Sequence, residues 1–160
     1  AVYNLYTDSG GTKQLRLDFN AAGLPAEVKC AVYDFWSDTV IGTATDSYST
    51  ESLEHDSSAL LRFTPLVGDR PQLVGSNLHL SIGATEVDDM SMLFSTLKVT
   101  LSDAGAQAGA LTFYSKKTLV AAGTKNCEIS LVESLGDNLW KVHLTGRQWN
   151  KKQFIKLKVK

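Results

Sequence analysis

The chain has 160 residues, of which 43% are hydrophobic and 21% charged, and its net charge is −1. This composition is typical of a globular protein of one domain or two small ones. No apolar run approaches the roughly 20 residues of a membrane-spanning helix, so we exclude a transmembrane role. The N-terminal AVYNLY is strand-like and lacks the basic and apolar regions of a secretory signal. We therefore expect a mature chain or a piece of a longer one.

Alternation of apolar and polar residues runs along most of the chain and indicates β-strands. In KQLRLDF, Leu15, Leu17 and Phe19 fall on one face, and the polar residues between them fall on the other. Such a strand has one buried and one wet face. The same pattern recurs at residues 78–82, 97–101, 140–144 and 155–159.

Turn-forming clusters separate these segments at the spacing typical of antiparallel sandwiches. They read TDSGGT, WSDT, VGDRPQ, DAGAQAG, LGDN and GRQWNKK. The segment closest to a helical pattern, FNAAGLPAE, is interrupted by Gly23 and Pro25. We therefore predict an all-β chain.

A boundary is predicted within TPLVGDRPQLVGS, where proline and glycine punctuate the chain. Residues 1–66 hold four Lys/Arg and nine Asp/Glu, whereas residues 67–160 hold twelve and eight. An acidic half resting on a basic one, or two solvated surfaces, would explain this asymmetry. We predict two antiparallel β-sandwich modules of Greek-key or Ig-like type, 1–66 and 67–160. The first is small for a module unless it packs on something else.

Cys30 and Cys127 lie far apart and match no metal-binding spacing. Cys127 shares its inward parity with Ile129 and Leu131, and Cys30 shares its parity with valines. We expect buried free thiols in preference to a disulfide.

No catalytic or metal motif stands out. His55, His79 and His143 lie apart in the sequence, and we expect them on the surface. The EVDDM segment with Glu86, Asp88 and Asp89 could hold calcium, but it lacks the ligand spacing of a known loop. We therefore predict no catalytic residue, no cofactor and no metal.

Paired carboxylates of the glycosidase kind are suggested by Asp34 and Asp38, which flank Trp36 in AVYDFWSDTVIGTA. A short β-turn does not supply the deep cleft that would raise one pKa and bind a sugar ring. We interpret these carboxylates as structural.

Trp149 is the tryptophan in the most turn-like segment, and Arg147, Gln148 and Asn150 flank it. Aromatic faces with polar neighbours bind sugars, so these four residues are the candidate carbohydrate contacts. The alternative is that Trp149 packs over the end of a sandwich. Trp140 alternates with apolar residues and is expected in the core.

Several motifs of the first module resemble, in the same order, the C-terminal β-sandwich of bacterial glycoside hydrolases of the α-galactosidase (melibiase) type. The matching pieces are Val2–Asn4, Gly23–Pro25, Tyr33–Trp36, Ile41–Gly42 and Leu53–Pro65, which includes His55 and Ser58. The strand that usually precedes the first of these pieces is missing from this sequence. Residues 67–160 resemble no family that we recognise.

In such enzymes a (β/α) barrel carries both catalytic carboxylates, and the sandwich packs against it without taking part in the reaction. The resemblance therefore implies a non-catalytic accessory region whose partner is the catalytic barrel of its parent enzyme. Asp34 would satisfy backbone or turn donors, and Trp36 would cover the sandwich edge or contact the barrel. A periplasmic or extracellular location is also implied.

Two alternatives remain open. The chain could be a carbohydrate-binding module that uses the Trp149 surface, or a cell-surface adhesion or scaffold domain whose sheet edges recruit protein partners. Nucleic acid is not an expected partner, because Lys156, Lys158 and Lys160 alternate with apolar residues as the wet face of a strand. Nor is a membrane.

Overall fold

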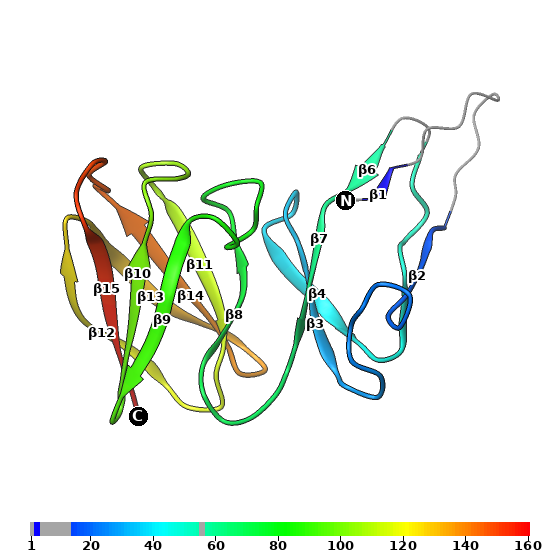
Figure 1. Ribbon diagram of the computed structural model, residues 1–160, viewed down its shortest axis with the longest axis horizontal. Helices are drawn as coiled ribbons and strands as arrows, with labels where there is room; N and C mark the ends of the chain where they lie inside the picture. Colours follow the sequence, from blue (N-terminus) through cyan, green and yellow to red (C-terminus); the bar gives the residue numbers. More distant parts are fainter. Residues whose placement is uncertain (1, 4–13, 55–56) are drawn as a thin grey trace. The chain divides into compact units, whose positions relative to one another are not determined.

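The computed structural model describes residues 2–3, 14–54 and 57–160, and these residues form β-strands, turns and loops without a helix (Figure 1). The predicted all-β class is confirmed for this part of the chain. The structure divides into two compact units, Ala1–Val67 and Gly68–Lys160. We call them unit 1 and unit 2. The boundary predicted from the sequence lies one residue earlier, after residue 66.

The described residues of unit 1 form three small sheets, and their strand pairings are antiparallel. Strand β3 is the middle strand of the sheet β4-β3-β7, while β2 pairs with β5 and β1 pairs with β6. The strands are β1 (Val2–Tyr3), β2 (Arg16–Asp18), β3 (Cys30–Asp34), β4 (Thr39–Ala44), β5 (Ser47–Ser49), β6 (Ser58–Ala59) and β7 (Leu61–Pro65).

The core of unit 1 is built around β3. Residues 30–33 are all buried, so both faces of this strand are covered. A run of apolar residues without alternation is the pattern that such a central strand requires. Beside it, the Phe63 ring makes edge-on contacts with Phe19 and Tyr48 at centroid distances of 5.3 and 5.5 Å. These rings join β5 and β7 to the turn after β2.

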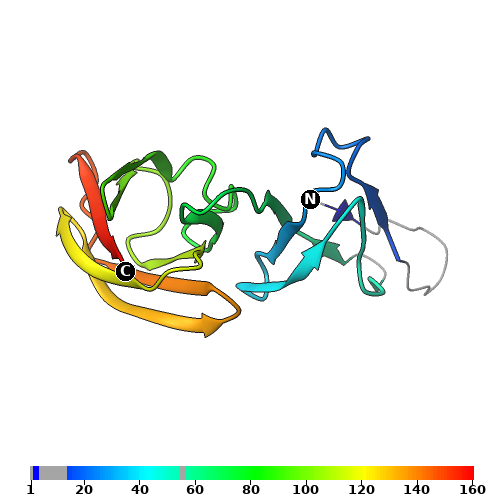
Figure 2. The ribbon, with the colours of Figure 1, turned by 90° about the horizontal axis from the view of Figure 1, so that it is seen from below.

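Unit 2 consists of two four-stranded antiparallel sheets, β12-β15-β10-β9 and β13-β14-β11-β8. Figure 2, which views the ribbon from below, shows the sheets on opposite sides of this unit. The strands are β8 (Gln72–Ser76), β9 (Val87–Leu93), β10 (Thr96–Leu101), β11 (Gly109–Tyr114), β12 (Leu119–Lys125), β13 (Glu128–Gly136), β14 (Leu139–Thr145) and β15 (Gln153–Val159).

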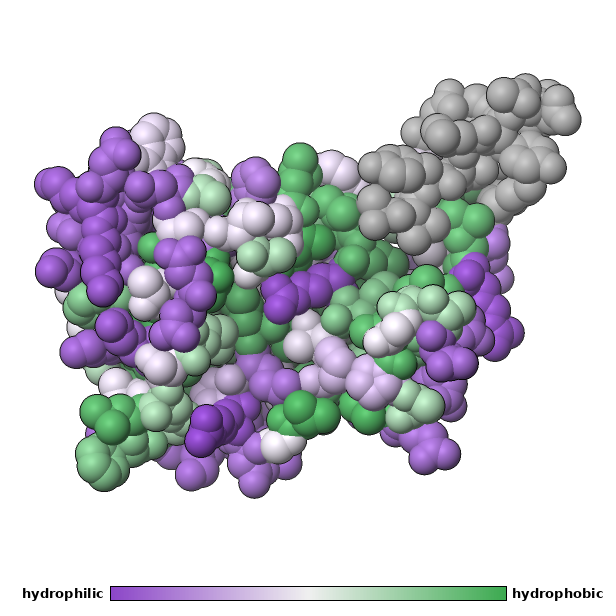
Figure 3. Space-filling view, in the orientation of Figure 1, coloured by the Kyte–Doolittle hydropathy of each residue, from purple (hydrophilic) through white to green (hydrophobic). Residues whose placement is uncertain are grey.

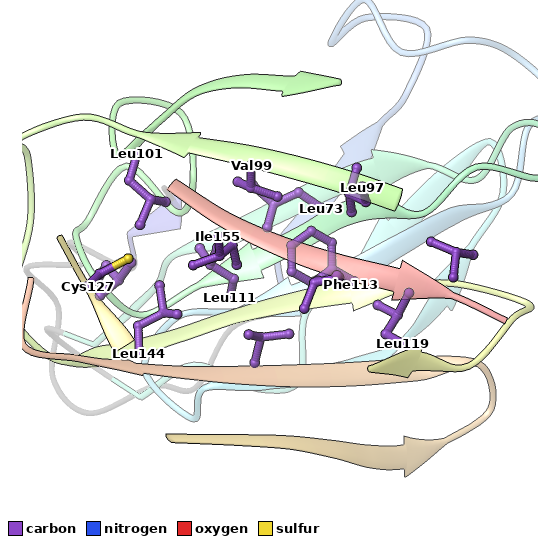
Figure 4. Close-up of a cluster of buried hydrophobic side chains, with 14 residues drawn as sticks. Leu73, Leu97, Val99, Leu101, Leu111, Phe113, Leu119, Cys127, Leu144 and Ile155 are labelled. Carbon is purple, nitrogen blue, oxygen red and sulfur yellow. The ribbon is translucent and has the colours of Figure 1, made fainter. Parts of the chain in front are cut away.

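Both sheets of unit 2 contribute side chains to one hydrophobic core (Figure 4). The alternation predicted at residues 97–101 and 155–159 is confirmed, because every second residue of β10 and β15 is buried in this core. Trp140 packs against the cluster as expected. The cluster consists of Leu73, Leu78, Leu97, Val99, Leu101, Leu111, Phe113, Leu119, Cys127, Val142, Leu144, Ile155, Leu157 and Val159.

The strand predicted at residues 78–82 is wrong, because this segment forms consecutive turns. The Ile82 amide donates to the His79 carbonyl at 3.0 Å, and the Ser81 amide donates to the His79 imidazole at 3.2 Å. Ile82 also has a positive φ of 53°. Local side-chain acceptors of this kind compete with sheet hydrogen bonding, which explains the failure of the alternation.

Leu131 does not share the inward side of Cys127, contrary to the predicted parity. Its side chain is exposed, whereas Ile129 and Val132 pack against the core. The register between β13 and β14 shifts between Ile129 and Leu131. A β-bulge at this point adds a residue and so exchanges the faces of the residues that follow.

Candidate functional site

The turn between β3 and β4 is held by its own carboxylates. Asp34 accepts hydrogen bonds from the Trp36 amide at 3.1 Å and from the Ser37 hydroxyl at 3.0 Å. Asp38 has a φ of 53° and accepts a hydrogen bond from the Tyr33 hydroxyl at 2.6 Å. Both carboxylates of the pair singled out in the sequence therefore stabilise the turn.

Trp36 projects from this rigid turn with 57% of its surface exposed. The Phe35 ring contacts it edge-on at a centroid distance of 5.2 Å, which restricts the indole. A large aromatic side chain that is both exposed and held in place is suited to contact a partner or a ligand.

Beside Trp36 lies a hollow of about 520 Å³ in unit 1. Its lining includes Asp34, Ile41, Tyr48 and Glu51 together with several Ser and Thr side chains. Burial raises the pKa of the Tyr48 phenol, and the nearby carboxylates of Glu51 and Asp34 raise it further. The hollow thus combines aromatic rings, hydroxyls and negative charge, a combination that can bind a polar ligand through both stacking and hydrogen bonds.

Tyr48 and Glu51 are not among the residues that the sequence analysis selected. Their segment, SYSTES, contains the three-residue strand β5, which is too short to show a period. An aromatic residue among hydroxyls is the one signal that the sequence offers here.

In unit 2, Trp149 lies in the loop between β14 and β15 and is 51% exposed. Gln148 and Asn150 are exposed beside it. The backbone amide of Asn150 donates to the Asp103 carboxylate at 2.9 Å, and the Lys151 ammonium donates to the Gln148 side-chain oxygen at 2.8 Å. The loop is therefore fixed by several hydrogen bonds, with its indole on the surface.

Arg147, predicted as a fourth carbohydrate contact, lies inside unit 2 with only 2% of its surface exposed. Its guanidinium donates to the backbone carbonyls of Ser102, Ala104 and Ala106 at 2.7, 3.0 and 2.8 Å, and to the Gln153 side chain at 3.2 Å. Burial lowers the pKa of Arg147. The structure therefore corrects the surface assignment: Arg147 joins two loops and is not presented to a ligand.

A second hollow, of about 580 Å³, adjoins the Trp149 loop. Asp88 and Asp103 line it together with Asn150 and the loop lysines Lys151 and Lys152. Charges of both signs border this space.

The three acidic residues of EVDDM do not converge. Glu86 is fully buried and accepts hydrogen bonds from the Gly83 amide at 2.6 Å and from the Ser81 hydroxyl, whereas Asp88 and Asp89 are exposed on β9. Burial raises the pKa of Glu86, but these hydrogen bonds, together with those of Ser76 and the Glu86 backbone, bring the pKa below the ordinary value. Within the described residues, no group of three His, Cys, Asp or Glu side chains could hold a metal ion.

The described histidines and cysteines do not gather into one site. His79 is exposed, His143 lies 2.7 Å from the Glu133 carboxylate, and His55 is outside the described residues. Cys30 and Cys127 are free and buried, as predicted, and burial raises the pKa of both thiols.

No family model matches the chain, and neither does any curated protein or solved structure. Among the described residues, no helix has the length and hydrophobicity to cross a membrane.

Proposed function

We propose that the chain is a non-catalytic accessory region of a glycoside hydrolase of the α-galactosidase type, and that unit 1 packs on the catalytic barrel of that enzyme. The observation that carries this proposal is the indole of Trp36, 57% exposed on a turn that Asp34 holds rigid. The motif resemblance of the first module supplies the enzyme class. A periplasmic or extracellular location belongs to the same proposal.

The chemistry of the Trp36 surface supports a protein contact. Ile41, on the neighbouring strand β4, is 46% exposed, and both side chains border the same hollow. Burying a side chain of this size against a partner stabilises the contact by roughly 1.5–3 kcal/mol. A unit of some 67 residues also buries a smaller fraction of its surface than a larger domain does, so contact with a larger body would stabilise it.

The proposal includes the Greek-key or Ig-like type of sandwich for both modules. Support comes from unit 2, where the chain crosses between the sheets after β8, β10, β11, β12 and β14.

A pair of matched variants tests the accessory role. Trp36→Ala and Trp149→Ala remove indoles of similar exposure from the two units. In the isolated chain, we expect each to change the free energy of unfolding by less than about 0.5 kcal/mol. In the protein encoded by the complete reading frame, we expect Trp36→Ala to lower the melting temperature by at least about 2 °C while Trp149→Ala does not.

Equal melting temperatures for these two variants of the complete protein would contradict a barrel contact at Trp36. A complete reading frame that encodes no (β/α) barrel would remove the proposal altogether.

A second candidate function, carbohydrate binding, is favoured by Trp149, whose indole is 51% exposed beside the amide side chains of Gln148 and Asn150. Gel electrophoresis in the presence of neutral galactan or mannan tests it. Binding would retard the chain, and Trp149→Ala would abolish the retardation while Trp36→Ala would not. Migration that no neutral polysaccharide changes would exclude this candidate.

A further inference from the structure

The outer face of the sheet β12-β15-β10-β9 carries a row of lysines. In the pairing of β10 with β15, Lys98 lies directly opposite Lys156, and Thr96 lies opposite Lys158. The residues between them in each strand are buried in the core, so these polar side chains all share the outer face. Two strands that meet only in the folded chain therefore bring three ammonium groups together.

Positive charge predominates on this face, where Asp89, opposite Thr100, is the carboxylate that strand β9 contributes. The ammonium groups of Lys98 and Lys156 lie 5.0 and 5.4 Å from the centroid of the Phe154 ring, which partly stabilises both. Like charges directly opposite each other destabilise a sheet. In the part of the chain that the structure describes, no carboxylate forms an ion pair with either lysine or with Lys158.

The hairpin that joins β9 to β10 presents two large apolar side chains beside these lysines. Leu93 is 71% exposed and Phe94 is 93% exposed. Phe94 also has a φ of 51° in a two-residue turn, a position that normally takes Asn, Asp or Gly. A bulky aromatic residue is costly at such a position, so the turn is not optimised for stability alone.

A hollow of about 420 Å³ is lined both by the lysine row and by the apolar residues of the hairpin. This volume falls within the range of roughly 300–1,000 Å³ that is usual for small-molecule sites. Figure 3 shows hydrophobic residues at the lower end of unit 2, where Figure 1 places the tip of this hairpin. The lining consists of Ser91, Leu93, Phe94, Thr96, Lys98, Lys156 and Lys158.

We propose that this face of unit 2 binds an acidic polysaccharide, one whose sugars carry carboxylates. The ammonium groups would neutralise the carboxylates, the Phe94 ring would contact the apolar face of a sugar, and the hydroxyls of Ser91 and Thr96 would bond to sugar hydroxyls. An extended chain of acidic sugars matches a row of charges along one face of a sheet. Leu93 and Phe94 also form an exposed apolar tip of the kind that enters a bilayer. The hydroxyls of Ser91 and Thr96, which line the hollow between the lysines and this tip, favour a sugar over a bilayer.

This inference goes beyond the proposed accessory role and is independent of it. It assigns a charged ligand and a different surface from that of Trp149. If the barrel contact at Trp36 is disproved, the acidic-polysaccharide site still stands. If that site is disproved, the barrel contact still stands.

Affinity electrophoresis with polygalacturonate tests the proposal, and highly methyl-esterified pectin is the matched polymer, with the same backbone and little charge. We expect retardation of the 160-residue chain by the first polymer and not by the second, weakening steeply as salt increases. Alginate serves as a second acidic polymer.

Charge-matched variants locate the site. The double substitution K98Q/K156Q is expected to raise the dissociation constant about tenfold or more, whereas K116Q/K117Q, in the loop between β11 and β12, is expected to leave it within about twofold. Phe94→Asn is expected to weaken binding while stabilising the turn, which separates loss of the ligand contact from loss of fold.

Three results would overturn the proposal. They are an absence of retardation by both acidic polymers, equal retardation by polygalacturonate and the methyl ester, and unchanged binding in K98Q/K156Q. A chain that sediments with phosphatidylserine vesicles but ignores both polymers would identify the face as a membrane contact instead.

Discussion

Arg147 donates a hydrogen bond to the backbone carbonyl of Ser102 at 2.7 Å, although 45 residues separate them in the chain. The same guanidinium reaches the carbonyls of Ala104 and Ala106 and therefore holds the whole loop between β10 and β11. That loop in turn contacts the Trp149 loop through Asp103. One buried cation thus organises this end of unit 2.

Replacing Arg147 with Met should destabilise unit 2 severely. Three backbone carbonyls would lose their buried donor, and each unsatisfied group costs roughly 1–3 kcal/mol. We expect the free energy of unfolding to fall by about 3 kcal/mol or more, as measured by urea denaturation followed by circular dichroism. Arg147→Lys should recover part of the loss, because an ammonium can donate to some of the same carbonyls. A loss below about 0.5 kcal/mol in Arg147→Met would show that the cluster contributes little.

Glu86 should make the stability of unit 2 sensitive to acid. Its folded-state pKa is lower than the unfolded value of about 4.3, since hydrogen bonds from Ser81, Gly83, Ser76 and its own backbone together outweigh the effect of burial. The ionised carboxylate therefore stabilises the fold above that value, and this contribution is lost as pH falls through the folded-state pKa.

The comparison with Glu86→Gln isolates this contribution from those of other carboxylates. Urea denaturation at a series of pH values should show a large stability difference between the wild type and the variant at pH 7. That difference should shrink as the pH falls from about 4 to 3. A difference that stays constant down to pH 3 would mean that the Glu86 carboxylate does not stabilise the fold through its charge.

The two thiols should report on the two units separately. Burial raises the pKa of both Cys30 and Cys127, so little reactive thiolate is present at neutral pH. We expect slow reaction with Ellman's reagent in the native chain and rapid reaction of both thiols in denaturant. With Cys127→Ala, the remaining Cys30 should react at lower urea than Cys127 does in Cys30→Ala, since unit 1 has the smaller sheets. Fast native reaction of either thiol would contradict its burial.

Asp34 should contribute to stability as a turn residue. Asp34→Ala removes the acceptors for the Trp36 amide and the Ser37 hydroxyl. We expect a loss of about 1–2 kcal/mol in the free energy of unfolding, and a smaller loss for Asp34→Asn, which keeps one acceptor oxygen. Urea denaturation monitored by tryptophan fluorescence would measure both. If Asp34→Ala unfolds at the same urea concentration as the wild type, the turn does not depend on this carboxylate.

The regular part of the fold follows from local pattern. The strict alternation at residues 97–101 and 155–159 predicts β10 and β15, because a strand with one buried face must alternate. The same pattern fails at residues 78–82, where the His79 and Ser81 side chains accept hydrogen bonds from backbone amides. It also fails at Leu131, where a bulge exchanges the two faces. Neither event has a signature in apolar periodicity.

The surfaces of the molecule were harder to predict, because they depend on pairings between distant residues. The turn-like segment around Arg147 predicts a surface position, yet carbonyls more than 40 residues away satisfy the guanidinium inside the fold. The cluster of Lys98 with Lys156 exists only through the register of β10 with β15. The polar turns around Trp36 and Trp149 single out these two indoles in the sequence, and both are exposed.

Hydrolysis of nitrophenyl α-galactoside is the measurement that tests the accessory role most directly. The protein encoded by the complete reading frame and the 160-residue chain would be assayed at equal concentration. The proposal predicts turnover by the complete protein and none above background by the chain. Turnover by the purified chain alone, or a complete protein without glycosidase activity, would contradict it.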